Sequence, residues 1–228
     1  MKAVFWIILQ VILVSGILYG YYHLFLRNNK FHQYNRFYLL AATIISLLVP
    51  FLNIPVYFTP EEKDSSLVWQ TLSALSSSDS PGVSTVMGAP TAQPGPSFTA
   101  IDLLYYSYMA VVIVFFVRMI YSLLKIRHII RNNTVEQLDD IYFVVTEEPT
   151  APFSFFKWLF WHKKTELSSQ KGEQIFRHEL FHIRQKHSAD IIFMEFVGAI
   201  GWINPFFLLI KRETIAIHEF LADQFAVI

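Results

Sequence analysis

The stretch "IFRHELFHIRQKHSAD", residues 175–190, interrupts a chain that is otherwise dominated by Leu, Ile, Val and Phe. It contains three His, one Glu and one Asp within sixteen residues. His178 and His182 are i and i+4, so on a helix both imidazoles lie on one face and can bind one zinc ion. Glu179 lies one step around the helix, where it can take a proton from water without occupying a ligand position. The H-E-x-x-H pattern therefore predicts a catalytic zinc site.

The composition indicates a membrane protein. Hydrophobic residues make up 54% of the chain and charged residues 16%, which is more apolar and less charged than an ordinary soluble domain. The apolar content predicts lipid as a partner. The formal net charge is zero, so direct contact with nucleic acid is not expected. The chain has no Cys, which excludes disulfides and thiolate ligands. Any metal ion must therefore be bound by nitrogen and oxygen atoms.

Three apolar runs are long enough to cross a bilayer as helices. They cover residues 3–26, 37–58 and 101–124. The first run is long for a secretory signal and lacks a small-x-small cleavage site, so we expect it to remain as a permanent helix. Residues 60–99, between the second and third runs, are rich in Ser, Pro and Gly and are predicted to form a flexible loop.

Residues 1–59 are predicted to form two transmembrane helices with a short cytoplasmic loop, and residues 60–99 a flexible extracytoplasmic loop. Residues 100–124 are predicted to form a third transmembrane helix, and residues 125–228 a cytoplasmic domain. The orientation follows from the basic residues, which concentrate in cytoplasmic connections. These residues are Arg27, Lys30 and Arg36 between the first two helices, and Lys125, Arg127 and Arg131 after the third. The N-terminus is therefore predicted to lie outside and the H-E-x-x-H segment inside.

Two segments of the cytoplasmic domain have the composition of strands. "IYFVVT" at residues 141–146 is rich in β-branched and aromatic side chains, and "PFSFFKWLFW" at residues 152–161 is strongly aromatic. We expect a small strand pair. Ser168 or Ser169 is expected to cap the helix that carries the H-E-x-x-H motif.

A catalytic zinc site usually has three protein ligands and a water molecule. Glu219 and Asp223 are i and i+4 on a predicted helix, so one carboxylate can bind zinc and the other can contact a ligand imidazole. His218 and Glu213 are alternatives to Glu219, but neither has a matched carboxylate partner. His187 lies about half a turn away from His178 around the helix that carries the H-E-x-x-H motif. We therefore expect it on the opposite face, as a surface residue or as a contact of a ligand imidazole.

The apolar run at residues 190–211 has the length of a fourth transmembrane helix. A straight span would put Glu219 outside while the H-E-x-x-H motif stays inside, so both cannot bind one ion. The run contains two glycines and the pair Asn204-Pro205, which are expected to break it into two halves. We therefore predict a re-entrant or interfacial helical hairpin that returns to the side it left, with zinc near the cytoplasmic membrane surface.

Four segments of the chain resemble a known family in their order and spacing. They are "APFSFFKWLFW" (151–161), "RHELFHIRQKHSAD" (177–190), "GWINPFFLLIKRE" (201–213) and "HEFLADQFAV" (218–227). The family consists of the bacterial integral membrane zinc metallopeptidases related to the beta-lactam sensor and signal-transducer proteins, also described as antirepressors of drug resistance. The three preceding helices agree with its pattern.

The resemblance implies a mainly helical membrane protein with a gluzincin-like zinc endopeptidase domain. His178, His182 and Glu219 would bind zinc, Glu179 would be the general base, and Asp223 would contact a ligand imidazole. Residues 152–156 would be the strand beside the cleft, where an extended substrate adds as a further strand.

The resemblance also implies a location and a role. The protein would be a multi-pass protein of the bacterial inner membrane with its active site in the cytoplasm. A signal sensed outside would pass through the helices to the peptidase, which cuts itself or a cytoplasmic protein such as a transcriptional repressor. The function expected from the resemblance is therefore proteolysis in signal transduction.

The sequence departs from the family at two places. Family members usually continue past the glutamate helix into another spanning helix and often an outer sensor domain, whereas this sequence stops at Ile228, so we expect a truncated chain or one that receives its signal from a sensor partner or an oligomer. The outer loop has no penicillin-binding S-x-x-K with a recognition domain, so sensing of beta-lactams is not expected. Two other functions stay open: a membrane-protein quality-control zinc protease and a non-catalytic zinc-binding membrane scaffold.

Overall fold

The computed structural model describes residues 2–29, 31–52 and 100–227. The chain divides into two units, of which the first combines residues 1–52 and 104–228 and the second comprises residues 53–103. The helices and strands that form the candidate site all belong to the first unit. The loop predicted at residues 60–99 lies outside the described residues.

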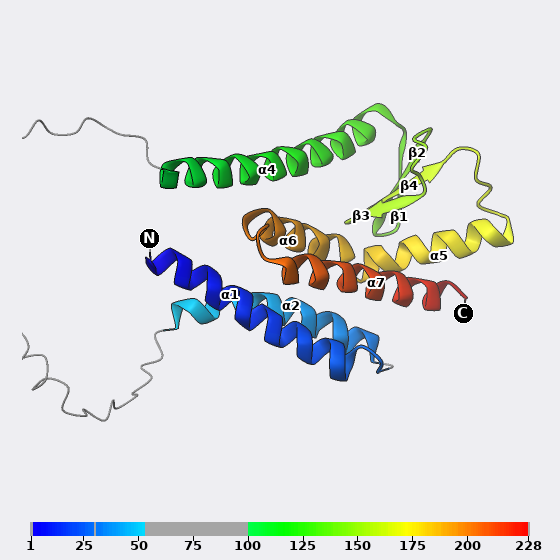
Figure 1. Ribbon diagram of the computed structural model, residues 1–228. Helices are drawn as coiled ribbons and strands as arrows, with labels where there is room; N and C mark the ends of the chain where they lie inside the picture. Colours follow the sequence, from blue (N-terminus) through cyan, green and yellow to red (C-terminus); the bar gives the residue numbers. More distant parts are fainter. Residues whose placement is uncertain (1, 30, 53–99, 228) are drawn as a thin grey trace, which may run out of the picture. The chain divides into compact units, whose positions relative to one another are not determined.

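The described residues are mostly helical, with one small sheet, as the sequence predicts (Figure 1). The main helices are α1 (Lys2–Tyr21), α2 (His32–Leu48), α4 (Ala100–Asn132), α5 (Gln170–Arg184), α6 (His187–Ile200) and α7 (Pro205–Val227). The strands are β1 (Val135–Leu138), β2 (Ile141–Thr146), β3 (Phe153–Phe155) and β4 (Trp158–His162). A π-helical turn, η1 (Tyr22–Leu26), extends α1, and a 3-10 turn, η2 (Val49–Phe51), extends α2.

Three helical stretches are long and apolar enough to cross a membrane: Phe5–Leu26, His32–Phe51 and Ile101–Asn132. Two boundaries differ from the sequence-based prediction. The second stretch begins at His32 because its first turns carry polar side chains with buried partners: Asn35 donates a hydrogen bond to the carbonyl of Leu26 at 2.9 Å. The third helix extends well past residue 124, where its last turns contact the sheet. Residues 53–58 of the predicted second span lie outside the described residues.

The sheet has four strands in the order β1-β2-β4-β3, and the prediction of a strand pair was wrong in two respects. The segment 152–161 is two antiparallel strands rather than one, because the chain turns at Phe156, whose φ is 50°. This turn is held from α6, where the Ser188 hydroxyl accepts a hydrogen bond from the Phe156 amide at 2.9 Å. Strand β1 has four exposed residues and lacks the apolar alternation that would have predicted it.

The two faces of the sheet pack against different helices. Adjacent residues of a strand point to opposite faces. Leu159 and Trp161 therefore pack toward α5 in one buried cluster, whereas Phe160 packs with Ile129 of α4 in another. The sheet thus packs against the side of α5 that faces away from the cleft.

The run at residues 190–211 is broken into α6 and α7, as predicted, by a turn at residues 201–204. The Asn204 side chain accepts a hydrogen bond from the Phe206 amide at 3.0 Å and so caps α7, which begins at Pro205. Gly201 is required at the turn because a Cβ there would lie 2.7 Å from the Phe207 ring. The chain therefore turns back on itself and brings the end of α7 to α5.

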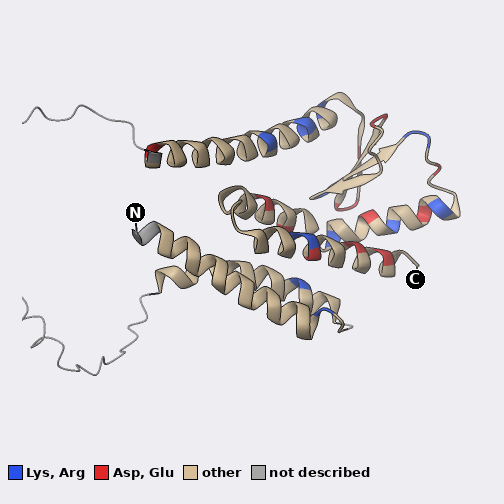
Figure 2. Ribbon diagram, in the orientation of Figure 1, with Lys and Arg blue, Asp and Glu red and all other residues tan. Residues whose placement is uncertain are grey.

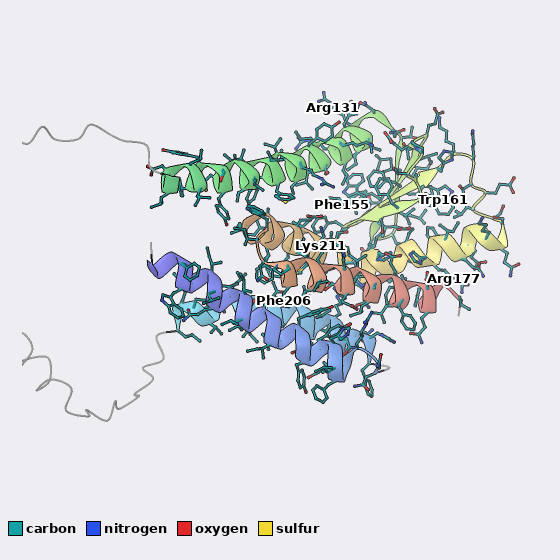
Figure 3. The ribbon with its side chains drawn as sticks, viewed as in Figure 1. Arg131, Phe155, Trp161, Arg177, Phe206 and Lys211 are labelled. Carbon is teal, nitrogen blue, oxygen red and sulfur yellow. The ribbon has the colours of Figure 1, made fainter. Side chains whose placement is uncertain are left out.

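The hairpin of α6 and α7 packs against α1 and α2. Leu39 of α2, Met194 of α6 and Ile210 of α7 belong to one buried cluster. Lys211, labelled in Figure 3, donates to Glu195 at 2.6 Å and ties the two helices of the hairpin. Figure 2 shows that α1 is almost free of charged residues whereas α5 and α7 carry both signs. Charged side chains of both signs therefore lie on α5 and α7, the two helices that form the candidate site.

Candidate metal centre

Helix α5, which carries the H-E-x-x-H motif, begins as the sequence predicts. Ser169 is its N-cap, and its hydroxyl accepts a hydrogen bond from the Gly172 amide at 3.0 Å. Gly172 in the first turn is not a weak point of the helix. A Cβ at this position would lie 2.1 Å from the carbonyl oxygen of Glu166, so only glycine allows the preceding loop to pass the helix start.

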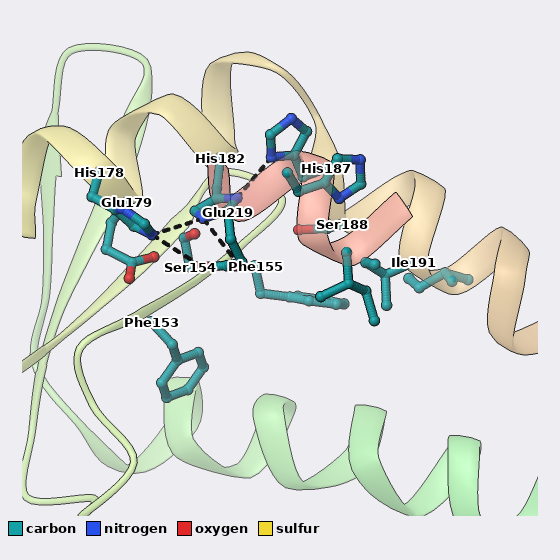
Figure 4. Close-up of a pocket in the computed structure, with 13 residues that line it drawn as sticks. Phe153, Ser154, Phe155, His178, Glu179, His182, His187, Ser188, Ile191 and Glu219 are labelled. Atoms are coloured by element: carbon teal, nitrogen blue, oxygen red, sulfur yellow. Dashed lines mark hydrogen bonds and ion pairs between the residues drawn. The ribbon is translucent and has the colours of Figure 1, made fainter. Parts of the chain in front are cut away.

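Three predicted ligands meet between α5 and α7 (Figure 4). One ligand atom each of His178, His182 and Glu219 lies within 4.8 Å of the other two. The two imidazole Nε2 atoms are 3.0 Å apart. The Glu219 carboxylate lies 3.5 Å from Nε2 of His178 and 3.8 Å from Nε2 of His182. The helical hairpin described above is what brings Glu219 to the two imidazoles.

These separations fit a tetrahedral zinc ion. Bonds of about 2.0–2.1 Å to nitrogen and oxygen set tetrahedral ligand atoms about 3.3–3.4 Å apart. The separation of 3.0 Å between the two Nε2 atoms, and the distances of 3.5 and 3.8 Å to the two oxygens of the Glu219 carboxylate, lie on both sides of that value. The donor set of two imidazoles and one carboxylate leaves a fourth position for water or substrate, as catalytic zinc sites require.

Asp223 contacts a ligand imidazole, in the position that the sequence predicts for it. Its Oδ1 lies 2.9 Å from Nδ1 of His178. A hydrogen bond donated by Nδ1 puts the lone pair of His178 on Nε2, which is the atom that faces the other ligands. The carboxylates of Asp223 and Glu219 therefore lie beside different nitrogens of the same His178 ring.

His187 contacts the second ligand imidazole, which is one of the two places expected for it, but the prediction that it lies on the opposite face was wrong. Its Nδ1 is 2.7 Å from Nδ1 of His182, and its side chain is buried. The helical-wheel argument fails because α5 ends at Arg184 and Lys186 adopts a left-handed conformation with φ of 55°. The chain is redirected there, and His187 becomes the first residue of α6.

The ionisable groups of the site are shifted in directions that suit metal binding and base catalysis. Burial and the nearby imidazoles of His178 and His218 lower the pKa of His182 to about 4, so this side chain is neutral at pH 7. Burial raises the pKa of Glu179 above its ordinary value, and this effect outweighs hydrogen bonds from Ser154 and the charge of His178. A carboxylate with a raised pKa is a stronger base.

The three ligands and Glu179 line a cleft of about 390 Å³ between α5, α7 and β3. Ser154 and Phe155 of β3 lie beside the ligands in Figure 4. Most of the remaining wall is apolar and consists of Phe153, Phe155, Ile191, Ile192 and Ile215. Strand β3 is at the edge of the sheet, so one of its sides lacks a strand neighbour among the described residues.

The two alternative third ligands have other partners. His218 is buried and lines the same cleft, but its Nε2 lies 3.0 Å from Oδ2 of Asp190 and it is not part of the ligand group. Glu213 accepts a hydrogen bond from Tyr22 at 3.3 Å and pairs with Arg27 at 3.4 Å. The structure therefore brings Glu219, and neither of these residues, to the two imidazoles.

Three residues near the site were not singled out from the sequence: Arg36, Asp190 and Ser154 contact the site or its neighbours. The charge of Arg36 was interpreted only as a marker of orientation, although an Arg in an apolar helix is a sign of a buried partner.

No family model and no curated protein matches this chain. The features that bear on its function are therefore the H-E-x-x-H motif and the geometry of the residues around it.

Proposed function

We propose that this chain is a membrane-bound zinc endopeptidase of the gluzincin type, similar to the beta-lactam sensor and signal-transducer family. The observation that carries the proposal is the convergence of His178, His182 and Glu219 within 4.8 Å, with the H-E-x-x-H glutamate lining the same cleft. The ligand atoms come from two helices separated by a long stretch of sequence. Such a convergence is not expected of charged residues that merely cover a helix face.

The side chains of the site have distinct roles in the proposed hydrolysis. A bound zinc ion would supply the positive charge that polarises the peptide carbonyl. Glu179 accepts the proton of the attacking water and transfers it to the leaving amine. Asp223 holds the His178 ring with Nε2 directed at the ion.

The cleft supports an extended peptide as the substrate. Strand β3 pairs with β4 on one side only, and its residues Ser154 and Phe155 line the cleft. A peptide can therefore add to β3 as a further strand, with its carbonyl beside the ligands. Phe153, Ile191 and Ile215 favour an apolar side chain next to the bond that is cut.

The proposed location is the bacterial inner membrane, with the N-terminus outside and the site at the cytoplasmic surface. Three helices with the length and composition of membrane spans support this location. The α6–α7 hairpin supports a site on one side of the membrane, because its two ends meet at α5. By its resemblance to the antirepressors, the peptidase acts in signal transduction, by cutting itself or a cytoplasmic repressor.

The proposal is tested with the full chain purified in detergent. Zinc content is measured by mass spectrometry, and cleavage is measured on the chain itself and on a library of extended peptides. Glu179→Gln should retain zinc and lose cleavage, whereas His182→Ala should lose both. Glu173→Gln is the matched control, because Glu173 is an exposed carboxylate on the same helix paired only with Arg177.

Three results would be informative. Cleavage that requires Glu179 but not Glu173 supports the peptidase. Equal cleavage by wild type and Glu179→Gln would show that a contaminant cuts the substrate. Stoichiometric zinc without cleavage of any substrate would favour the non-catalytic scaffold.

A further inference from the structure

Arg36 of α2 is a charged side chain buried in the interior of the protein. It is 5% exposed, and each of its three guanidinium nitrogens has a partner at the end of α5 or in the first turn of α6. Nε donates to Oδ2 of Asp190 at 2.6 Å, Nη2 to the backbone carbonyl of Gln185 at 2.7 Å, and Nη1 to the Gln185 side chain at 3.3 Å. Gln185 is the C-cap of α5, so Arg36 is bonded to the end of the helix that carries the H-E-x-x-H motif.

A continuous series of contacts runs from Arg36 to a candidate ligand. Asp190 Oδ2, which accepts from Arg36, lies 3.0 Å from Nε2 of His218. The His218 ring stacks on His187, with centroids 3.8 Å apart and planes 6° apart. His187 Nδ1 lies 2.7 Å from Nδ1 of His182. Each residue in the series thus has a near neighbour on both sides.

The nitrogen of His182 that faces the metal position determines which nitrogens of His182 and His187 carry a proton. If Nε2 of His182 faces the metal position, its Nδ1 carries the proton and donates to His187. Nδ1 of His187 then accepts, and its ring must keep that nitrogen turned toward His182. The stack on His218, held by Asp190 and Arg36, keeps the ring in this orientation.

A buried ion pair is weak evidence for stability, since desolvation of the two charges offsets most of their attraction. Apolar residues of similar volume would stabilise this packing as well. The pair Arg36 and Asp190 is more readily explained by what it orients. Both of its attachment points, Gln185 and Asp190, flank His187 in the chain.

We propose that Arg36 is a positioning residue for the metal centre, acting from α2 through Asp190, His218 and His187 to fix the ring of His182. The proposal rests on the proposed function, in which His178, His182 and Glu219 bind zinc. It identifies a physical route between an apolar helix of membrane-spanning length and the catalytic site. A shift of α2 relative to α6 would release His187 and weaken one ligand without contacting the ion.

The test compares full-length variants in detergent by three measurements: the dissociation constant for Zn²⁺ by chelator competition, the absorption spectrum of the Co²⁺-substituted protein, and the melting temperature without metal. Arg36→Met/Asp190→Asn removes both charges and keeps an oxygen near His218, so no buried charge is left unpaired. Arg27→Met is the matched control, because Arg27 ends the neighbouring helix and pairs with Glu213, which does not contact the ligands.

The double variant should melt within a few degrees of wild type, bind zinc about 10–100-fold more weakly, and show altered Co²⁺ bands. Arg27→Met should match wild type in affinity and spectrum. If the double variant does not fold, His187→Phe decides, since it keeps the stack on His218 and removes the acceptor for His182. The same loss of affinity is expected there.

Wild-type affinity and spectrum in a folded double variant, or in His187→Phe, would overturn the positioning role and leave the proposed peptidase standing. A wild-type protein that binds neither Zn²⁺ nor Co²⁺ would overturn both. These two failures are therefore distinguishable.

Discussion

His178 and Asp223 are joined by a contact of 2.9 Å between Nδ1 and Oδ1, although they lie on different helices. Asp223 is one helical turn beyond Glu219, whose carboxylate lies 3.5 Å from the other nitrogen of the same ring. Both nitrogens of the His178 ring thus lie beside carboxylates of α7. The arrangement is that of a metal-binding histidine whose second nitrogen is oriented by a carboxylate.

Removal of this orienting contact should weaken metal binding without removing a ligand. Asp223→Ala is expected to reduce zinc affinity about 10–100-fold, and Asp223→Asn to reduce it less because the amide oxygen still accepts from Nδ1. The affinities are measured by chelator competition. Equal affinities for wild type and Asp223→Ala would show that the contact does not support the site.

The ion pair of Arg36 and Asp190 should make stability depend on pH below about 4, near the ordinary pKa of an Asp in an unfolded chain. Burial raises the pKa of Asp190, but hydrogen bonds from His218 and Arg36 and the charge of Arg36 outweigh it, so the pKa in the fold is lowered. A lowered pKa adds stability above the unfolded value, and this stability is lost as the pH falls through the folded value. The metal-free melting temperature of wild type should therefore fall more steeply in this range than that of Arg36→Met/Asp190→Asn. Parallel curves for the two proteins would contradict the prediction.

Two glycines in neighbouring helices should respond in opposite ways to alanine. Gly172→Ala places a Cβ 2.1 Å from the Glu166 carbonyl and should reduce the free energy of unfolding by about 1–3 kcal/mol. Gly198→Ala meets nothing within 4 Å inside α6 and should raise it by about 0.5–1 kcal/mol, because glycine loses more backbone entropy on folding. Thermal unfolding in detergent measures both. A Gly172→Ala variant as stable as wild type would contradict the packing described for the start of α5.

The apolar wall of the cleft should determine which peptides are cut. Ile215→Lys places a positive charge in the cleft and should reduce kcat/KM for peptides with Leu or Phe beside the cut bond about 10-fold or more, while peptides with Glu there improve. Competition between paired peptides, with products identified by mass spectrometry, measures the change. An unchanged preference would exclude Ile215 from the substrate site.

The hairpin predicts that the sheet and the end of α7 lie on one side of the membrane. The chain has no Cys, so single substitutions report cleanly. Lys163→Cys and Gln224→Cys are both exposed and should react with an impermeant maleimide in inside-out vesicles, but not in intact cells. Labelling of Gln224→Cys alone from outside would show that α6 or α7 crosses the bilayer, which would separate Glu219 from the two imidazoles.

The parts of the fold that the sequence predicted are those set by local patterns. Apolar length predicted the three long helices, the H-E-x-x-H spacing predicted a shared face for His178 and His182, and Asn204-Pro205 predicted the break of the hairpin. These features depend on residues close together in the chain, where spacing determines geometry.

The missed features depend on contacts between distant segments. The turn at Phe156 has no glycine and is held by Ser188, which is remote in the sequence, so the segment 152–161 had the pattern of one strand. His187 was misplaced because a single left-handed residue, Lys186, ends the helical periodicity. The partner of Arg36, Asp190, lies far away in the chain, so no local pattern identifies it. Tertiary structure determines all three.

The return of α7 to α5 has a consequence for biogenesis. During synthesis the two imidazoles emerge first, and the chain must complete both arms of the hairpin before Glu219 can join them. In the proposed peptidase only two of the three ligands would be present until then, and affinity for zinc would be correspondingly low. Metal loading and closure of the hairpin would thus be a single linked equilibrium, and hydrolysis would be confined to chains whose insertion and folding are finished.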